Sequence, residues 1–526
     1  MRILWILFFL ASWYSGAAQA ALDPAVLRQL ADDDSDVKIA AIQQIAQSAD
    51  PLAERVLKAL ADDGLAVVDT KILILEDEQA VDAATGAAVV PAPENPDTIV
   101  VNNRVRSALN AALAALNLFN PDRATRFSAT RALAQSADAS IAPLLTRALQ
   151  QEKDPEIKEQ LTEVLAFANL QNADAAVRLA AVKTLGASSR PNVRNALEAQ
   201  LSTESVEAVR IAIQASLRAI DGRIALGEQV GRIFSGISLG SVLLLAALGL
   251  AITYGVMGVI NMAHGELLMI GAYATYAVQS AFRHYFPAAL DWYVLAAIPV
   301  AFFSAALVGI LMERTVIRWL YGRTLETLLA TWGLSLILIQ SARVIFGAQN
   351  VEVSNPSWMS GGVSVVSNLV LPWNRIIIIG FALFVLLLVW VLLNRTRLGM
   401  FVRAVTQNRP MASCVGVPTG RIDSLAFGLG AGIAGLGGVA LSQISNVGPD
   451  MGQGYIVDSF MVVVLGGVGQ LAGSVWAALG LGVVTKFLEG WAGAVIAKIA
   501  VLIFIIIFIQ KRPQGLFALK GRFVEN

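Results

Sequence analysis

Cysteine and histidine are scarce in this chain of 526 residues. Cys414 is the single cysteine, and His264 and His284 are the two histidines. One thiol cannot form an intrachain disulfide or a cysteine-rich metal site. Two histidines give little support to metal binding or to catalysis by a Ser–His or Cys–His pair. We therefore expect no catalytic residue, no metal site and no cofactor.

Charged residues are also few, at 15% of the chain, against roughly 25% in an ordinary soluble domain. The shortage is confined to one part. Residues 21–228 contain 29 acidic and 20 basic side chains, whereas residues 229–526 contain only 10 acidic and 18 basic ones. This distribution excludes one large soluble enzyme and a disordered chain. It indicates a water-facing domain fused to a membrane domain.

The sequence shows no phosphate-binding or nucleic-acid-binding pattern. Gly466-Gly467-Val468-Gly469 is rich in glycine, but no Lys-Ser or Lys-Thr follows it and no strand–helix pattern surrounds it. No basic stripe with interleaved aromatic residues occurs either. We expect that the chain neither hydrolyses ATP by itself nor binds nucleic acid.

The first twenty residues have the pattern of a signal peptide. Arg2 precedes an apolar run at residues 3–10, and Ala18-Gln19-Ala20 has the small-x-small pattern of a cleavage site. The run is short for a membrane span, which needs about 20 apolar residues. We expect cleavage after residue 20 and export of the domain that follows.

Residues 21–228 contain a repeated helical pattern. Residues 38–50 align with residues 126–138, and further copies begin at Arg178 and Arg210. Asp- or Asn-containing turns precede the first three copies, and such turns cap helices. The pattern resembles HEAT-type repeats, which predicts an all-α solenoid. Residues 65–100 interrupt it with a Val- and Ile-rich stretch, Gly86 and three prolines, which favour a small β-hairpin insertion.

Residues 229–526 predict a polytopic α-helical membrane domain with about nine spans. Starting outside, nine passes end in the cytoplasm. The loops that would then face the cytoplasm hold 12 of the 18 basic residues, and those facing outward hold five, as the positive-inside rule requires. The seventh span is short and rich in glycine and can be broken or re-entrant. The expected spans are residues 233–254, 258–281, 292–312, 325–346, 375–394, 422–444, 456–469, 472–490 and 493–510.

Three segments of this domain resemble the branched-chain amino-acid class of ABC importer permeases. They are residues 247–266, residues 403–417 and residues 464–473. The exported N-terminal domain, together with the ending at residues 507–517, is similar to the permease subunits of urea ABC transporters. The resemblance implies a transport subunit of a bacterial inner membrane rather than an enzyme, with its N-terminal domain in the periplasm and its C-terminus in the cytoplasm. It also implies a second related permease, two cytoplasmic ABC ATPases and a periplasmic solute-binding protein as partners.

The resemblance places a coupling loop, which contacts the ATPase, on the basic segment 395–421. A lipid-binding basic loop is the alternative. The coupling residues that it implies are Arg403, Ala404, Asn408, Ala412, Gly416 and Val417.

A path for a small neutral solute such as urea needs hydrogen-bond donors and acceptors but no fixed charge. Polar residues in or beside the apolar spans can supply them. For His264 and Glu266 we prefer a structural role at the break between the first two spans, with a place in the path or in proton coupling as the alternatives. The candidates are Thr253, Tyr254, Asn261, His264, Glu266, Thr331 and Gln340.

Three classes of function stay open at this point. The first is the permease of an ATP-driven importer, for urea or else for a branched-chain amino acid or another small amide. The second is a passive urea channel or an ion-coupled carrier. The third is a membrane-anchored scaffold, although nine spans are more than an anchor needs.

Overall fold

The computed structural model describes residues 22–517, apart from 49, 69–70, 77–78, 90–96, 135–138, 189 and 367–368. Contacts divide the chain into two compact units, with the boundary between Ile224 and Ala225. The expected signal peptide at residues 1–20 lies outside the described residues and stays a prediction.

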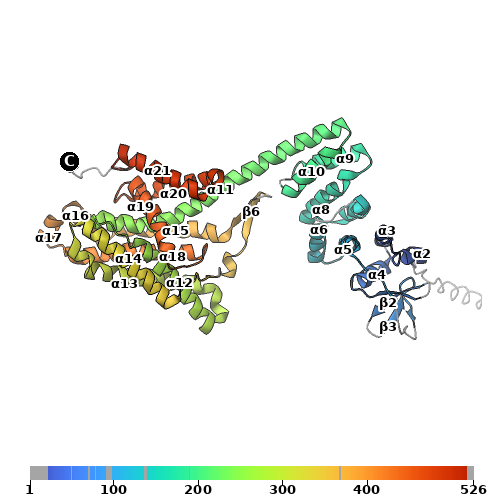
Figure 1. The fold of residues 1–526 in the computed structure, drawn as a ribbon, viewed down its shortest axis with the longest axis horizontal. Coiled ribbons are helices and arrows are strands. Elements are labelled where there is room, and N and C mark those ends of the chain that lie inside the picture. Colours follow the sequence, from blue (N-terminus) through green and yellow to red (C-terminus); the bar gives the residue numbers. More distant parts are fainter. Residues whose placement is uncertain are drawn as a thin grey trace, which may run out of the picture. The chain divides into compact units, whose positions relative to one another are not determined.

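The first unit is built mainly from short helices that pack on their neighbours in sequence (Figure 1). Asp34, Asp122 and Asp174 each accept a backbone N–H at the start of a helix, which confirms the predicted caps. Such a cap stabilises a helix by about 1 kcal/mol. The helices are α2 (Pro24–Gln29), α3 (Ser35–Gln47), α4 (Pro51–Ala61), α5 (Asn103–Asn117), α6 (Arg123–Leu133), α7 (Ala142–Gln151), α8 (Pro155–Ala168), α9 (Ala175–Leu185) and α10 (Pro191–Thr203).

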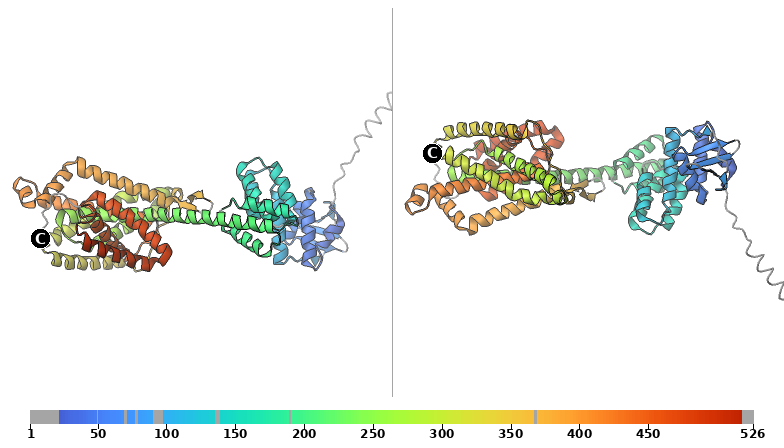
Figure 2. Two further views of the ribbon diagram at one scale, coloured as in Figure 1. Left: turned by 90° about the horizontal axis from the view of Figure 1, so that it is seen from above. Right: turned by 90° about the horizontal axis from the view of Figure 1, so that it is seen from below.

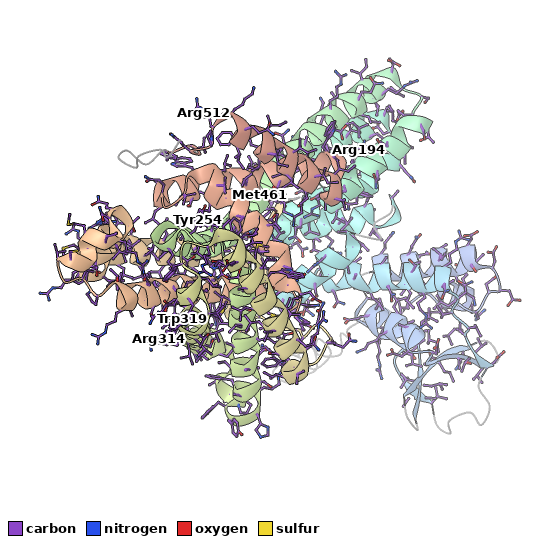
Figure 3. The ribbon with its side chains drawn as sticks, turned by 60° about the vertical axis from the view of Figure 1, so that its left-hand side comes forward. Arg194, Tyr254, Arg314, Trp319, Met461 and Arg512 are labelled. Carbon is purple, nitrogen blue, oxygen red and sulfur yellow. The ribbon has the colours of Figure 1, made fainter. Side chains whose placement is uncertain are left out.

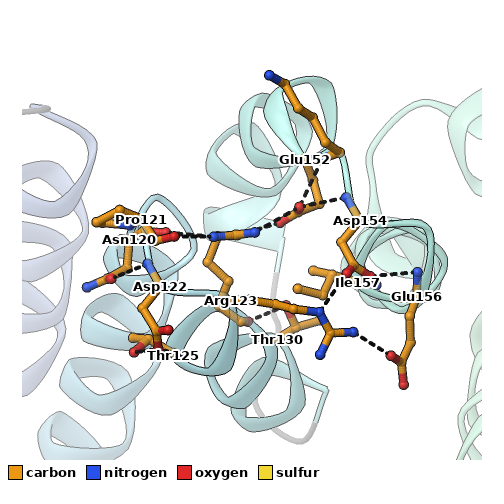
Figure 4. A network of polar contacts seen from close by, with 12 residues as sticks. Asn120, Pro121, Asp122, Arg123, Thr125, Thr130, Glu152, Asp154, Glu156 and Ile157 are labelled. Atoms are coloured by element: carbon orange, nitrogen blue, oxygen red, sulfur yellow. Dashed lines mark hydrogen bonds and ion pairs between the residues drawn. The ribbon is translucent and has the colours of Figure 1, made fainter.

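Two copies of the sequence repeat have the same set of side-chain bonds, and Figure 4 shows the first of these sets. Arg126 forms an ion pair with Glu152 and donates to the carbonyl of Asn120, and Arg178 pairs in the same way with Glu204 and the carbonyl of Asn172. Both Arg–Glu pairs span 26 residues. The Arg178 guanidinium lowers the pKa of Glu204 to about 2, although burial opposes the shift. Two of the four sequence copies therefore close with the same largely buried ion pair.

The predicted hairpin at residues 65–100 is larger in the structure, where five antiparallel strands form one sheet in the order β4-β3-β2-β1-β5. Leu65, Ile72 and Ile74 are buried in the core of the unit, and β2 contacts α2 and α4 (Figure 1). The outer strands β4 and β5 have two residues each, which is too short for an alternating pattern to show in sequence. The strands are β1 (Leu65–Val68), β2 (Lys71–Glu76), β3 (Gln79–Asp82), β4 (Ala88–Val89) and β5 (Asp97–Thr98).

The second unit has a helix at each of the nine expected spans, and in both views of Figure 2 its helices lie side by side. The first of them, α11, begins before the unit boundary. The helices are α11 (Glu207–Met257), α12 (His264–Tyr285), α13 (Tyr293–Thr315), α14 (Thr324–Phe346), α15 (Trp373–Arg395), α18 (Thr419–Ser442), α19 (Met451–Gly466), α20 (Leu471–Ala492) and α21 (Ala494–Lys511).

Seven helices, rather than the nine expected, are long and apolar enough to cross a membrane among the described residues. The two that fall short are α12 and α19. Helix α12 carries Glu266, Arg283 and His284, which lower its mean hydropathy. Helix α19 has only 16 residues, fewer than the ~20 that a span requires.

Helix α18 is the enclosed centre of the second unit, with 89% of its most apolar window buried. It packs along both α12 and α13. A Cβ atom added to Gly435 would collide with the Ala301 carbonyl of α13, and one added to Gly271 of α12 would collide with the backbone of Gly435. Small residues therefore let these helices approach closely, backbone to backbone.

Smaller elements connect the long helices of the second unit. Helices α16 (Arg397–Gln407) and α17 (Arg409–Cys414) lie between α15 and α18, and the short helix η4 (Ile317–Leu320) follows α13. Strands β6 (Gly362–Val366) and β7 (Leu369–Pro372) form an antiparallel hairpin that the sequence analysis did not predict.

Candidate functional site

The break between α11 and α12 brings several of the candidate pathway residues together. Helix α11 ends at Met257 because Gly258 takes a positive φ of 66°, a conformation that suits glycine. Asn261 is fully buried in the break, and its Oδ1 accepts the N–H of Ala263. His264 is fully buried as well, and its Nε2 lies 2.9 Å from the carbonyl oxygen of Ala246. Since a carbonyl only accepts, Nε2 carries the proton.

Helix α14 supplies the opposite wall of the break. Ser335 donates a hydrogen bond to Oε1 of Glu266, and Thr331 accepts the N–H of Met262 at 3.2 Å. The sequence analysis missed Ser335. The sequence contains a pattern that identifies Ser335, because the polar residues Thr327, Thr331 and Ser335 are four apart and therefore share one face of a helix.

Three buried polar atoms at this break have no hydrogen-bond partner among the residues that the structure describes. They are Nδ2 of Asn261, Nδ1 of His264 and Oε2 of Glu266. A buried polar atom without a partner costs about 1–3 kcal/mol. The break therefore contains one buried amide nitrogen and two buried acceptor atoms without partners.

The other candidate pathway residues are not part of this cluster. The hydroxyl of Thr253 donates to carbonyls of its own helix, Gly249 and Leu250. Tyr254 is half-buried (Figure 3), and Gln340 is exposed on α14. In the described part of the chain, no side-chain hydrogen bond joins Tyr254 or Gln340 to the break, so the geometry does not support these two side chains as members of the site.

The segment that resembles a coupling loop folds as α16 and α17. Asn408 is the cap of α17, where its Oδ1 accepts the N–H of Met411, and Arg403 donates to the carbonyl of Leu393. Gly416 ends the segment with a positive φ of 87°, and the N–H of Val417 returns to the carbonyl of Ala412.

The outward face of α17 differs from the expected one. Ala412 is only 4% exposed and packs in the core of the second unit, so it is not available to a partner. Ala404 is half-buried. Met411 and Val415, which the sequence analysis did not single out, are 60% and 71% exposed. These two apolar side chains form the outward face of the loop.

A network of charged groups lies beneath α17 and ties it to α18. Arg409 forms an ion pair with the fully buried Asp423 and lies over the ring of Tyr321, 4.7 Å from its centre. The hydroxyl of Tyr321 donates to Glu313 at the end of α13. Burial raises the pKa of Tyr321, and the carboxylates of Asp423 and Glu313 add to the shift. Tyr321 is therefore a neutral donor.

Arg318 completes the network from η4. Its guanidinium donates to both carboxylate oxygens of Glu313, at 3.2 and 3.1 Å, and these hydrogen bonds raise the pKa of Arg318. The same guanidinium donates to the hydroxyl of Ser424 at the start of α18. Helix α17 is thereby joined to the ends of α13 and α18 through a chain of direct contacts.

Comparisons with known proteins agree with the resemblance. The profile of the family described as "Branched-chain amino acid transport system / permease component" matches residues 232–510. The chain is 28% identical over 291 residues to the high-affinity branched-chain amino acid transport system permease protein BraD of Pseudomonas aeruginosa, which covers 54% of this chain and 94% of that relative.

Two further relatives extend the comparison. The corresponding permease LivH of Escherichia coli is 29% identical over 293 residues, covering 54% of this chain and 94% of LivH. The ribose import permease RbsC of Escherichia coli is 31% identical over 105 residues, covering 19% of this chain and 33% of RbsC. No solved structure matches the chain.

Proposed function

The chain belongs to the family of branched-chain amino acid transport system permease components, and from this membership we propose that it is the membrane subunit of an ATP-driven importer of urea. Like its relatives, it is a transport subunit and not an enzyme. The observation that carries the urea assignment is the set of unpaired atoms at the α11–α12 break.

The unpaired atoms match urea in number and type. Urea accepts hydrogen bonds at its carbonyl oxygen and donates them from its amino groups, so it can receive one from Asn261 and give one each to His264 and Glu266. Residues 258–266 contain no Lys or Arg that would pair with the carboxylate of a branched-chain amino acid. The N-terminal unit supports the same assignment. The matches cover 94% of BraD and LivH but only 54% of this chain, so this unit is an addition to the amino-acid permeases, and such an addition resembles the urea permeases.

Uptake into proteoliposomes tests the proposal. The chain is reconstituted with a second permease, two ATPases and a solute-binding protein, the partners that the importer class requires. ATP-dependent uptake of urea but not leucine is expected. Uptake of leucine but not urea would replace urea by a branched-chain amino acid, and urea uptake without ATP would indicate a passive channel.

The two units have separate roles in this proposal. The N-terminal unit is a HEAT-like solenoid on the periplasmic side of the inner membrane, where it docks the solute-binding protein. The C-terminus is cytoplasmic, in keeping with the arginine-rich loops beside α16 and α17. The outward side chains of Met411 and Val415 then meet the ATPase, and the network of Arg409 and Asp423 carries its movement to the spans.

A further inference from the structure

Three hollows adjoin one another near the junction of α20 and α21. The first is open, about 740 Å³ in volume, and lined by charged residues that include Arg232, Arg375 and Lys486. The second, of about 380 Å³, shares Lys486 and Glu489 with the first. The third, of about 520 Å³, shares Lys498 with the second. The three hollows are therefore neighbours on the second unit, and we refer to them together as the depression.

The middle hollow is charged but electrically balanced. Lys498 forms an ion pair with Asp458 at 3.2 Å, and Lys486 forms one with Glu489. The side chains are partly open: Lys498 is 54% exposed and Glu489 is 27% exposed. Two cations and two carboxylates therefore face the same small space.

The third hollow is an apolar groove between α19 and α21. Its walls include Met461, which Figure 3 labels, together with Val495, Ile499 and Leu502. Val495 is 74% exposed and Ile499 is 52% exposed. The groove runs from the first turn of α21 to Leu502, which is roughly 12 Å at the rise of an α-helix.

The polar end of the depression lies at the level of the membrane surface. Trp491 is 87% exposed at the end of α20, and tryptophan is enriched where hydrocarbon meets water. Arg375 is in the first turn of α15. The groove leads away from this level along an apolar helix, toward the hydrocarbon. Polarity thus changes along the depression in the same order as along a phospholipid.

We propose that this depression is a binding site for one membrane phospholipid with an ammonium-bearing head group. Its phosphate pairs with Lys498, its ammonium group pairs with Asp458 and Glu489, and one acyl chain occupies the groove beside Val495. This site is separate from the transport function and requires only that the unit is embedded in a bilayer.

The balance of charge selects the head group. An anionic lipid would bring a phosphate to Lys498 without supplying a cation that replaces this lysine as the partner of Asp458. A zwitterionic head group supplies both signs, so that each side chain keeps an opposite charge nearby when water leaves the hollow. The site is therefore expected to prefer phosphatidylethanolamine over phosphatidylglycerol.

The test measures phospholipid bound to the full-length chain. The protein is placed in nanodiscs with equal amounts of phosphatidylethanolamine and phosphatidylglycerol, extracted with detergent and washed, and the retained lipid is quantified by mass spectrometry. About one phosphatidylethanolamine per chain is expected. Lys498→Gln should lower retention roughly tenfold, because it removes a charge-assisted hydrogen bond, whereas Lys511→Gln at the other end of α21 should not change it.

A second pair of variants leaves every charge in place. Val495→Trp fills the groove and should abolish retention, while Ile496→Trp, next in sequence and 59% exposed but lining none of the three hollows, should not. Equal retention by these two variants would overturn the proposal, as would a preference for phosphatidylglycerol. A cross-link from Val495→Cys to another polypeptide, without retained lipid, would also overturn it, because a protein would then cover the groove.

Discussion

Replacing Arg409 by methionine tests whether the ion pair beneath α17 holds the coupling loop in place. Asp423 is fully buried, so the change leaves a buried carboxylate without its cation. Breaking a wholly buried pair costs about 3–5 kcal/mol. Because the Arg409 side chain is 38% exposed, water screens part of this energy and we expect about 2 kcal/mol. That energy lowers the ratio of docked to undocked α17 roughly 30-fold.

The expected result is uncoupling rather than loss of the protein. The reconstituted importer should still hydrolyse ATP, but it should import much less urea per ATP than the unaltered protein does. Arg421→Met is the matched control, since Arg421 is an exposed arginine in the same region. Adding Asp423→Asn to Arg409→Met should recover part of the coupling, because the double variant no longer buries an uncompensated charge.

The reasoning fails if Arg409→Met imports as much urea per ATP as the Arg421→Met control at equal amounts of inserted protein. It also fails if Asp423→Asn lowers the urea imported per ATP by the same factor in the Arg409→Met background as in the unaltered protein. The two residues would then act independently.

Three other outcomes are expected. Val415→Glu should reduce ATP-driven uptake at least tenfold without lowering the amount of inserted protein, because it places a charge on the exposed apolar face of α17; normal uptake would contradict the contact with the ATPase. In a Cys414→Ser background, Ala187→Cys should react with an impermeant thiol reagent outside intact spheroplasts, and Gln407→Cys only after permeabilisation; the reverse pattern would invert the proposed orientation. Deleting residues 22–220 behind the signal peptide should weaken uptake per inserted permease more at low urea than at high urea, whereas a uniform loss would rule out docking of the binding protein.

Hydropathy and periodicity predicted the positions of the long helices well, because burial in lipid or in a helical core leaves a regular pattern. The pattern was less informative where helices carry polar residues or are short. Glu266 in α12 and the 16 residues of α19 reduce the candidate spans to seven. The sheet in the first unit was underestimated for a similar reason, since β4 and β5 have two residues each.

The candidate site was predicted in part. Asn261, His264 and Glu266 are close in sequence, so their positions along the chain were enough to predict that they lie near one another at the break. Ser335 joins them from a distant helix, and that pairing depends on the packing of α14, which one sequence does not specify. Ala412 was expected to face outward and does not, because the rotation of a six-residue helix is set by its tertiary contacts rather than by its own pattern.

The glycine contacts of α18 determine which parts of the membrane unit can move during transport. Where backbone meets backbone, as at Gly271 and Gly435, a rotation of either helix would bring a side chain into space that admits only a hydrogen atom. Helices α12, α13 and α18 must therefore move together as one block. The apolar windows of α14, α15, α20 and α21 are between 17% and 33% buried, so fewer internal contacts oppose their displacement.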